Sequence, residues 1–448
     1  MADDDLRASF TNITEQEWLD IDDRLSIEEL GEGEHKKFLY KLLAQLERIP
    51  QANLQENQLE NWSKGGIQAQ PVLLRAKGCK IQGKAVRIEK IELGESEKSF
   101  YLLNHYYRLR VEEENGADVL LYLRELPDDW NVSELASGAV TLQEPVEVDA
   151  VFYRQASYGV GSETIETEEG DHKVVSDESD KSKPLFLFVG KRLAWYPNMN
   201  REPFHLDDSL LLLGQKKFDV SLFDGVRKNQ NGRLSSEERA CFFELLERAN
   251  ELANVEERVP QIEFRTLYEE HRGAHGKEFE IAGVVRRVTK VAVEEETLQE
   301  KLGKAYYQID LFMELGDLQV VLDREKELVY RRRYPVTVCL RELPEGLSVG
   351  ENLSVDLKVR GFYYRWWAYP APFVSRVSED RLAVSPLFIG SSAELVEYQE
   401  TSFWYLEILF GILFLAIITG VCYSLWKSSK KSFEREDFQQ NDFQEPHE

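Results

Sequence analysis

Two histidines four residues apart are the chain's nearest approach to a metal-binding pair. His271 and His275 lie in EEHRGAHG, and a helix would place both rings on one face, with Glu269 or Glu270 able to add an oxygen ligand. The two glycines of the same stretch favour a loop instead. The sequence holds no Walker, HExxH, GxSxG or Rossmann pattern. We therefore expect a non-enzymatic protein without metal, cofactor or catalytic residue, and a metal-dependent enzyme using this pair is the alternative.

A run of aromatic residues around one arginine is a stronger candidate for binding. The stretch GFYYRWWAYPAPF covers Gly361–Phe373, and on a strand half of its side chains point away from the interior of the sheet. Exposed rings beside an arginine can stack on bases, sugars or prolines. The alternative is that the rings pack on one another, on another domain or on the membrane-proximal linker. The candidate binding residues of this run are Tyr364, Arg365, Trp366 and Trp367.

Further arginines could extend such a surface. The stretch YRRRYP supplies three of them, Arg331, Arg332 and Arg333. Two more, Arg124 and Arg341, lie in a motif that the chain spells twice, in VLLYLRELPDDW and VTVCLRELPEGL. Each time an alternating apolar stretch runs into a proline and an acidic turn, which is the pattern of a strand that ends. We interpret LRELP as a strand exit, and ligand contact by its arginine is the alternative.

The segments that carry these residues occur in two copies. IQGKAVRIEKI at Ile81–Ile91 aligns with IAGVVRRVTKV at Ile281–Val291, and the same spacing of 200 residues relates two Tyr-Tyr pairs. Upstream, FLYKLLAQL at Phe38–Leu46 resembles CFFELLERA at Cys241–Ala249. The matches come in the same order in both halves of the chain. A period this long indicates two duplicated globular domains rather than a solenoid.

Each copy is predicted to be one helix followed by five strands. The strand count, the glycine in the first strand and the short polar stretch NVSELASGA before the fourth strand resemble an OB-fold barrel. The resemblance covers Gly78–Tyr196 and Gly276–Ser391, and an SH3-like or other small barrel is the alternative. It implies a mainly β fold with α, made of two helix-plus-barrel modules at 34–205 and 206–392. OB barrels bind oligonucleotides or oligosaccharides across one face.

The C-terminal region predicts a membrane span. From Ile408 to Trp426, 19 residues carry no charge, which is enough to cross about 30 Å of hydrocarbon as a helix, and aromatic residues stand at both ends. The sequence thus predicts a transmembrane helix at 403–426 within the lipid bilayer and a polar tail at 427–448. Tandem modules on a terminal span resemble uncharacterised single-pass membrane proteins of planctomycete-type bacteria.

The charges beside the span bear on its orientation. Lys427, Lys430, Lys431 and Arg435 follow it, whereas the residues before it carry only acids. The positive-inside rule therefore places the tail in the cytoplasm and the body outside. The opening residues MADDDLRASFTNITEQEWLD show no export signal. Either the protein is tail-anchored with a cytoplasmic body, against the charge rule, or the given start lacks an export signal. We expect an extracytoplasmic body.

The acidic balance of the chain limits its partners. A net charge of −26 repels phosphate backbones, so nucleic acid is disfavoured. The first 33 residues are acidic and are expected to be disordered, and an insertion with eight acids from Glu163 to Asp180 is expected to be a solvated loop. Together the features predict a membrane-anchored binding or scaffold protein of a bacterial cell envelope, with a protein or glycan as partner. The alternative is a cytoplasm-facing binder of single-stranded nucleic acid through the second barrel.

Overall fold

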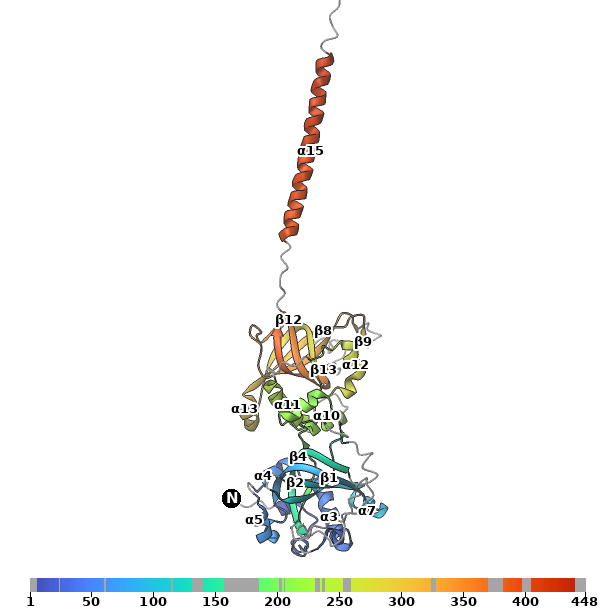
Figure 1. Ribbon diagram of the computed structural model, residues 1–448, viewed down its shortest axis with the longest axis vertical. Coiled ribbons are helices and arrows are strands. Elements are labelled where there is room, and N and C mark those ends of the chain that lie inside the picture. Colours follow the sequence, from blue (N-terminus) through green and yellow to red (C-terminus); the bar gives the residue numbers. More distant parts are fainter. Residues whose placement is uncertain are drawn as a thin grey trace, which may run out of the picture. The chain divides into compact units, whose positions relative to one another are not determined.

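The computed structural model is a mixed α/β protein with two β-sheets and one long C-terminal helix (Figure 1). It separates into two units, Met1–Leu395 and Val396–Glu448. The structure describes residues 6–23, 25–59, 62–113, 116–130, 140–156, 185–200, 204, 206–229, 234–235, 238–252, 259–323, 328–369, 382–396 and 404–439. The acidic insertion around Glu163–Asp180 and the polar stretch at 131–139 lie outside these residues.

The first sheet closes on itself through five strands. Its strands are β1 (Gly78–Glu92), β2 (His105–Glu113), β3 (Asp118–Leu123), β4 (Val140–Ala156) and β5 (Leu185–Gly190). They pair in the order β1-β2-β3-β5-β4, and β4 returns to β1; β3 and β5 are parallel, and the other pairs are antiparallel. A short sixth strand, β6 (Ala194–Trp195), lies along β4. Helix α7 (Glu95–Tyr101) connects β1 to β2.

The second sheet is a closed barrel with the same circuit. Its strands are β7 (Glu278–Ala292), β8 (Ala305–Glu314), β11 (Arg333–Leu340), β12 (Gly350–Tyr369) and β13 (Ala383–Leu395). The order is β7-β8-β11-β13-β12, with β11 parallel to β13. Helix α13 (Glu296–Leu302) stands where α7 stands in the first sheet. A separate hairpin of β9 (Val320–Asp323) and β10 (Leu328–Tyr330) is inserted before β11.

The two circuits share irregularities as well as order. The register of β1 shifts between Ala85 and Arg87, and that of β7 shifts between Val285 and Arg287. Each shift follows a glycine that admits no side chain, because a Cβ at Gly83 or at its counterpart in β7 would overlap a backbone carbonyl of the neighbouring strand. In both strands the bulge therefore follows a glycine at which the neighbouring strand comes too close for a side chain.

Short helices at the N-terminus pack on the first sheet. They are η1 (Leu6–Ser9), α1 (Glu15–Leu19), α2 (Ile27–Leu30), α3 (Gly33–Leu46), α4 (Gln51–Glu56), α5 (Lys64–Ala69) and α6 (Pro71–Leu74). The prediction that residues 1–33 are disordered is wrong from Leu6 onward, since Leu6, Phe10 and Trp18 are buried. A capping box between Thr14 and Glu17 starts α1, and its Trp18 packs edge-on against Phe10. The acidic composition conceals these few large apolar residues.

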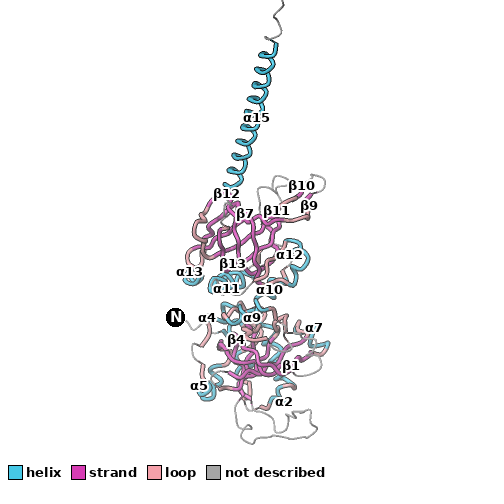
Figure 2. The backbone as a smooth tube through the Cα atoms, turned by 45° about the horizontal axis from the view of Figure 1, so that its top comes forward, coloured by secondary structure: helices cyan, strands magenta, loops and turns pink. Residues whose placement is uncertain are grey.

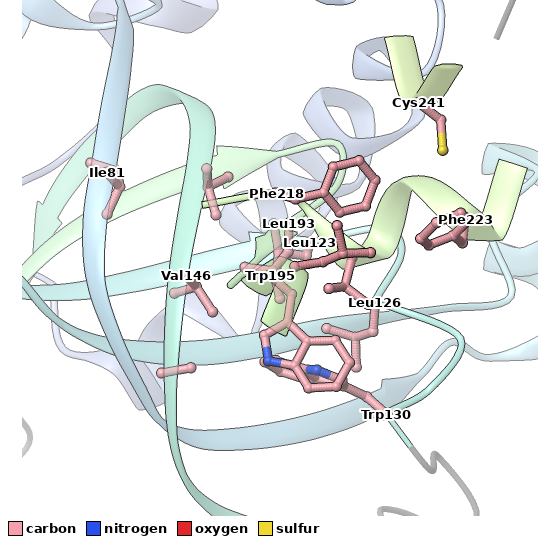
Figure 3. Packing of buried hydrophobic residues seen from close by; sticks show 14 of the residues in the cluster. Ile81, Leu123, Leu126, Trp130, Val146, Leu193, Trp195, Phe218, Phe223 and Cys241 are labelled. Atoms are coloured by element: carbon pink, nitrogen blue, oxygen red, sulfur yellow. The ribbon is translucent and has the colours of Figure 1, made fainter. Parts of the chain in front are cut away.

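The residues between the sheets join them through one hydrophobic core. They form α9 (Asp208–Gln215), η3 (Val220–Leu222), α10 (Phe223–Lys228), α11 (Glu238–Glu251), α12 (Phe264–Glu270) and η4 (His271–Gly273). One cluster of buried residues runs from the interior of the first sheet at Leu123 and Trp195, through Phe223 and Cys241, to Ile389 of the second sheet. Figure 3 shows its first part, where α10 and α11 meet the first sheet. The two predicted modules thus belong to a single compact unit.

Helix α15 (Trp404–Gln439) is the C-terminal element of the described chain (Figure 2). Among the described residues it is the one helix long and apolar enough to cross a membrane, with a span of 21 residues from Ile408 to Ser428. The helix continues past the span into the predicted polar tail as far as Gln439, and residues 440–448 lie outside the described chain.

Candidate functional site

Tyr364 and Arg365 lie inside the protein rather than on a binding face. Arg365 is 4% exposed, and its guanidinium forms an ion pair with Glu238, the first residue of α11. The hydroxyl of Tyr364 donates to the Glu238 carbonyl at 3.0 Å, and Arg365 Nε donates to the Trp366 carbonyl at 2.9 Å. The prediction that these two residues offer an open surface for stacking is therefore wrong, because α11 covers them.

The two tryptophans of the aromatic run are half-buried, and each packs against another aromatic ring. Trp367 Nε1 donates to the hydroxyls of Thr337 and Ser385, each at 3.1 Å, and its ring stacks on Tyr369 with centroids 5.0 Å apart. Trp366 packs edge-on against Phe264. The contact of Trp367 with Tyr369 confirms the part of the alternative in which the aromatic side chains pack on one another.

Helix α11 covers part of the outer face of the second sheet, over β13 and the adjoining parts of β11 and β12. Alternation along β13 sends Phe388 into the barrel core, whereas Leu387 and Ile389 face outward. The outward residues belong to the same buried cluster as Phe242 and Leu246, which stand on one side of α11. A helix that buries this stripe leaves the sheet no open surface at these positions.

Helix α3 covers part of the outer face of the first sheet. Leu121 and Leu123 of β3 face the barrel core, and Tyr122 between them faces the cluster that contains Leu43 of α3. Tyr40 of α3 meets Tyr106 of β2 edge-on, with centroids 5.9 Å apart. In both modules the helix that precedes the sheet in the sequence contacts the sheet's last long strand, β5 or β13.

The arginines of the LRELP motif sit at strand exits, as interpreted from the sequence. Arg124 Nη1 donates to the carbonyl of Leu43 at 2.9 Å and Arg124 Nε lies 2.9 Å from Glu47, so this side chain holds the C-terminal end of α3. Arg341, after β11, is half-buried. The structural reading explains Arg124 fully.

The basic stretch before β11 is the part of the predicted surface that stays open. Arg331 and Arg332 are exposed between β10 and β11. Arg333 forms an exposed ion pair with Glu314 at 3.4 Å. The structure therefore separates these arginines, which reach solvent, from Tyr364 and Arg365, which do not, and it does not assemble one basic and aromatic face from them.

The histidine pair is held by local backbone contacts. His271 Nδ1 is 2.8 Å from the Tyr268 carbonyl, and His275 Nδ1 is 3.1 Å from that of Arg272. The His275 ring lies against Tyr363, and burial lowers the pKa of His275 to about 4. Within the described ranges, no group of three or more His, Cys, Asp or Glu side chains is placed to hold a metal ion.

A partly buried charged cluster between the sheets was not visible in the sequence. Arg192 forms an ion pair with Asp219, whose amide donates to Glu244 Oε1 at 3.1 Å. Burial raises the pKa of Glu244 to about 7, and it raises that of Asp224 nearby in α10 to about 7 as well. These carboxyls come from separate segments, so no spacing in the chain announces the cluster.

Comparisons with known proteins identify no family. No protein-family profile and no curated protein matches the chain. Among solved structures, the N-terminal domain of PriB from Thermoanaerobacter tencongensis is 14% identical, over 27% of this chain and 97% of that one, with a TM-score of 0.15. The single-stranded DNA binding protein of Thermus aquaticus is 8% identical, over 72% of this chain and 93% of that one, with a TM-score of 0.14. A putative aspartyl-tRNA synthetase from Leishmania major Friedlin is 11% identical, over 57% and 49%, with a TM-score of 0.15. Scores this low assign no function.

Proposed function

We propose that this chain is a membrane-anchored, non-enzymatic scaffold protein of the cell envelope, with a protein or a glycan as its partner. The observation that carries the proposal is that α3 and α11 each cover part of the outer face of their own sheet and bury its outward apolar residues. A single core then joins the two sheets. Such a body is a preformed rigid support rather than an open groove for a strand of nucleic acid.

The two modules are, in this proposal, duplicated OB-like barrels. The strand circuit with its one parallel pair is the same in both, and the bulges after Ala85 and Val285 lie 200 residues apart. The layout of two such barrels before a terminal helix supports kinship with the planctomycete-type membrane proteins that the sequence resembles. The partner would then bind outside the helix-covered faces, and Arg331 and Arg332 are the exposed candidates.

The orientation follows from the charges around α15. Lysines follow its apolar span and acids precede it, which favours a cytoplasmic tail and an extracytoplasmic body. Three of the four cysteines are buried and the fourth, Cys422, lies in the span, so a Cys422→Ala background allows single-cysteine labelling. We would compare Ser348→Cys in the body with Asn441→Cys in the tail, using a membrane-impermeant maleimide on cells stripped of outer layers. Labelling of the body alone supports the proposal, and labelling of the tail alone overturns its orientation.

The nature of the partner can be tested at the exposed arginines. A photo-crosslinking residue at Arg332 should give a discrete adduct in cells, and the same residue at Arg239 on α11, which is also exposed, serves as a matched position on another surface. An adduct that resists nuclease and yields to protease or glycosidase supports the scaffold function. A nuclease-sensitive adduct would replace it with the single-stranded nucleic-acid alternative, which the net charge of −26 opposes.

A further inference from the structure

One buried arginine follows the same bulge in both modules. The register of β4 shifts between Phe152 and Arg154, and that of β12 shifts between Tyr363 and Arg365. Arg154 is 0% exposed, and its Nε donates to the carbonyl of the next residue at 3.2 Å, as Arg365 does at 2.9 Å. The two side chains therefore occupy equivalent places beneath the covering helix of each sheet.

Only the second of these arginines is neutralised by the helix above it. Arg365 pairs with Glu238 at the start of α11. The buried residues Leu42 and Leu43 of α3 match Leu245 and Leu246 of α11, a spacing of 203 residues that places His35 opposite Glu238. At the aligned position the first module thus has His35, whereas the second module has Glu238. Arg154 Nη1 and Nη2 are buried without a hydrogen-bond partner in the part of the chain that the structure describes.

A second arginine beside Arg154 adds to the excess of positive charge. Arg75 is 1% exposed; it donates to the carbonyls of Trp18 and Ile21, each at 2.8 Å, and forms an ion pair with Asp23. Its Nε and the indole Nε1 of Trp18 also lack partners among the described residues. Desolvation lowers the pKa of Arg75 despite Asp23, and the nearby charge of Arg154 lowers it further. Asp23 is the carboxylate beside these donors, and its Oδ1 already accepts from the Gln155 amide, while the Arg154 guanidinium lies over the Tyr153 ring, 5.8 Å from the centroid.

A buried charge without a counter-charge is costly, and guanidinium groups bind carboxylate and phosphate oxygens through paired N–H groups. We propose that Arg154, with Arg75, is a binding site for an oxyanion, a carboxylate or phosphate group that takes in the first module the place that Glu238 takes in the second. The N-terminal segment 6–23 covers the site through Trp18 and Ile21, so the anion is enclosed as that segment packs. Occupancy then stabilises the packed segment by mass action.

The test is thermal unfolding of the detergent-solubilised full chain at constant ionic strength, with chloride replaced stepwise by inorganic phosphate or by acetate. The wild type should show a saturable rise of a few degrees in Tm. The Arg154→Leu variant should show no such rise and should unfold without the anion at or above the wild-type Tm, since it has lost an unpaired buried charge. A response to phosphate alone assigns a phosphate ligand, and a response to acetate assigns a carboxylate.

Two further variants keep the test decisive if Arg154→Leu does not fold. His35→Glu supplies the missing carboxylate within the chain, so its Tm should rise and its anion response should disappear. Arg365→Leu instead leaves the buried Glu238 without its ion-pair partner. The Tm of this variant should fall in every buffer, while its response to the anion remains. An equal response of wild type and His35→Glu, or no response of the wild type to either anion, overturns the proposal.

Discussion

At the scale of single residues, the pair of Arg365 and Glu238 is the sharpest test of how the covering helices are attached. Both side chains are buried, so removing one partner leaves the other charge without compensation. We expect Glu238→Leu to lower the free energy of unfolding by about 3–5 kcal/mol. The double variant with Arg365→Leu should recover the part of that loss that comes from the unpaired arginine, but not the part from the Asn229 and Ser235 donors that also bind Glu238. Denaturant unfolding of the four proteins measures the cycle, and additive losses would contradict a direct pair.

Glu244 predicts a pH dependence. Burial raises its pKa in the folded protein to about 7, from a reference value of 4.5. The folded state therefore holds this proton more tightly than the unfolded state does, so the contribution of Glu244 to stability falls as pH rises from about 4.5 to about 7 and is level above that. The Glu244→Gln variant should lack this part of the profile. In unfolding measured from pH 5 to pH 8, the stability difference between wild type and variant should grow up to about pH 7 and then stay level. Parallel profiles would contradict the assignment.

The sequence predicted the strands well, but it did not predict which residues surround Arg365 and Glu244. The alternation around Arg365 placed the aromatic run on a strand, and β12 covers it to Tyr369. It did not show what lies over the outward side chains, because the partner Glu238 is distant in the sequence and joins a different element. The cluster around Glu244 was missed for the same reason. Contacts between distant segments leave no local spacing to read.

At the scale of elements, the close approach of β2 to the bulged strand β1 predicts that replacing Gly83 destabilises the protein. A Cβ at Gly83 would overlap the carbonyl of Glu112 on β2, so Gly83→Ala must displace backbone. We expect a loss of about 1–3 kcal/mol or more in the free energy of unfolding. Gly225→Ala is the matched control, since it lies in α10 with nothing within 4 Å of its Cβ and alanine favours helix. Equal stabilities of the two variants would show that β1 and β2 do not approach closely.

Elements with strong periodicity were predictable, and elements made by a few residues were not. The repeated pattern around Gly83 located β1 and β7, and the apolar spacing of Leu42, Leu43 and Leu46 located α3. The helix around Trp18 was lost in an acidic background, because one turn offers too few positions for a period to appear. A packed N-terminus could have been inferred only from the aromatic residues themselves.

At the scale of the whole molecule, the shared core predicts that the body unfolds as one. Phe223 is fully buried in the cluster that reaches from the first sheet to the second. Denaturation of residues 1–395 should therefore give one transition by both tryptophan fluorescence and far-ultraviolet circular dichroism. Phe223→Ala should shift this transition as a whole, by about 3–5 kcal/mol. Two separate transitions would mean that the modules are energetically independent.

The separation of the body from α15 predicts that the protein is held in the membrane by this helix alone. The body ends at Leu395 as a compact unit, and the apolar span begins at Ile408. A chain stopped after Leu395 should remain folded and move from the membrane pellet to the supernatant after ultracentrifugation. The full chain should stay in the pellet in high salt and leave it only with detergent. Release of the full chain by salt would mean that α15 does not enter the bilayer.

The position of each covering helix ahead of its sheet has a consequence for synthesis. As the chain leaves the ribosome, the apolar stripe of α3 emerges before any strand that will cover it, and the first sheet can close only when β5 arrives to pair with β3. Helix α11 emerges next, yet its cover on the second sheet is the late strand β13. Each helix thus spends most of its module's synthesis exposed, and such surfaces are the ones that chaperones bind and that aggregate when translation stalls. Slowing elongation after α3 should therefore reduce the yield of folded protein more than slowing it after β5.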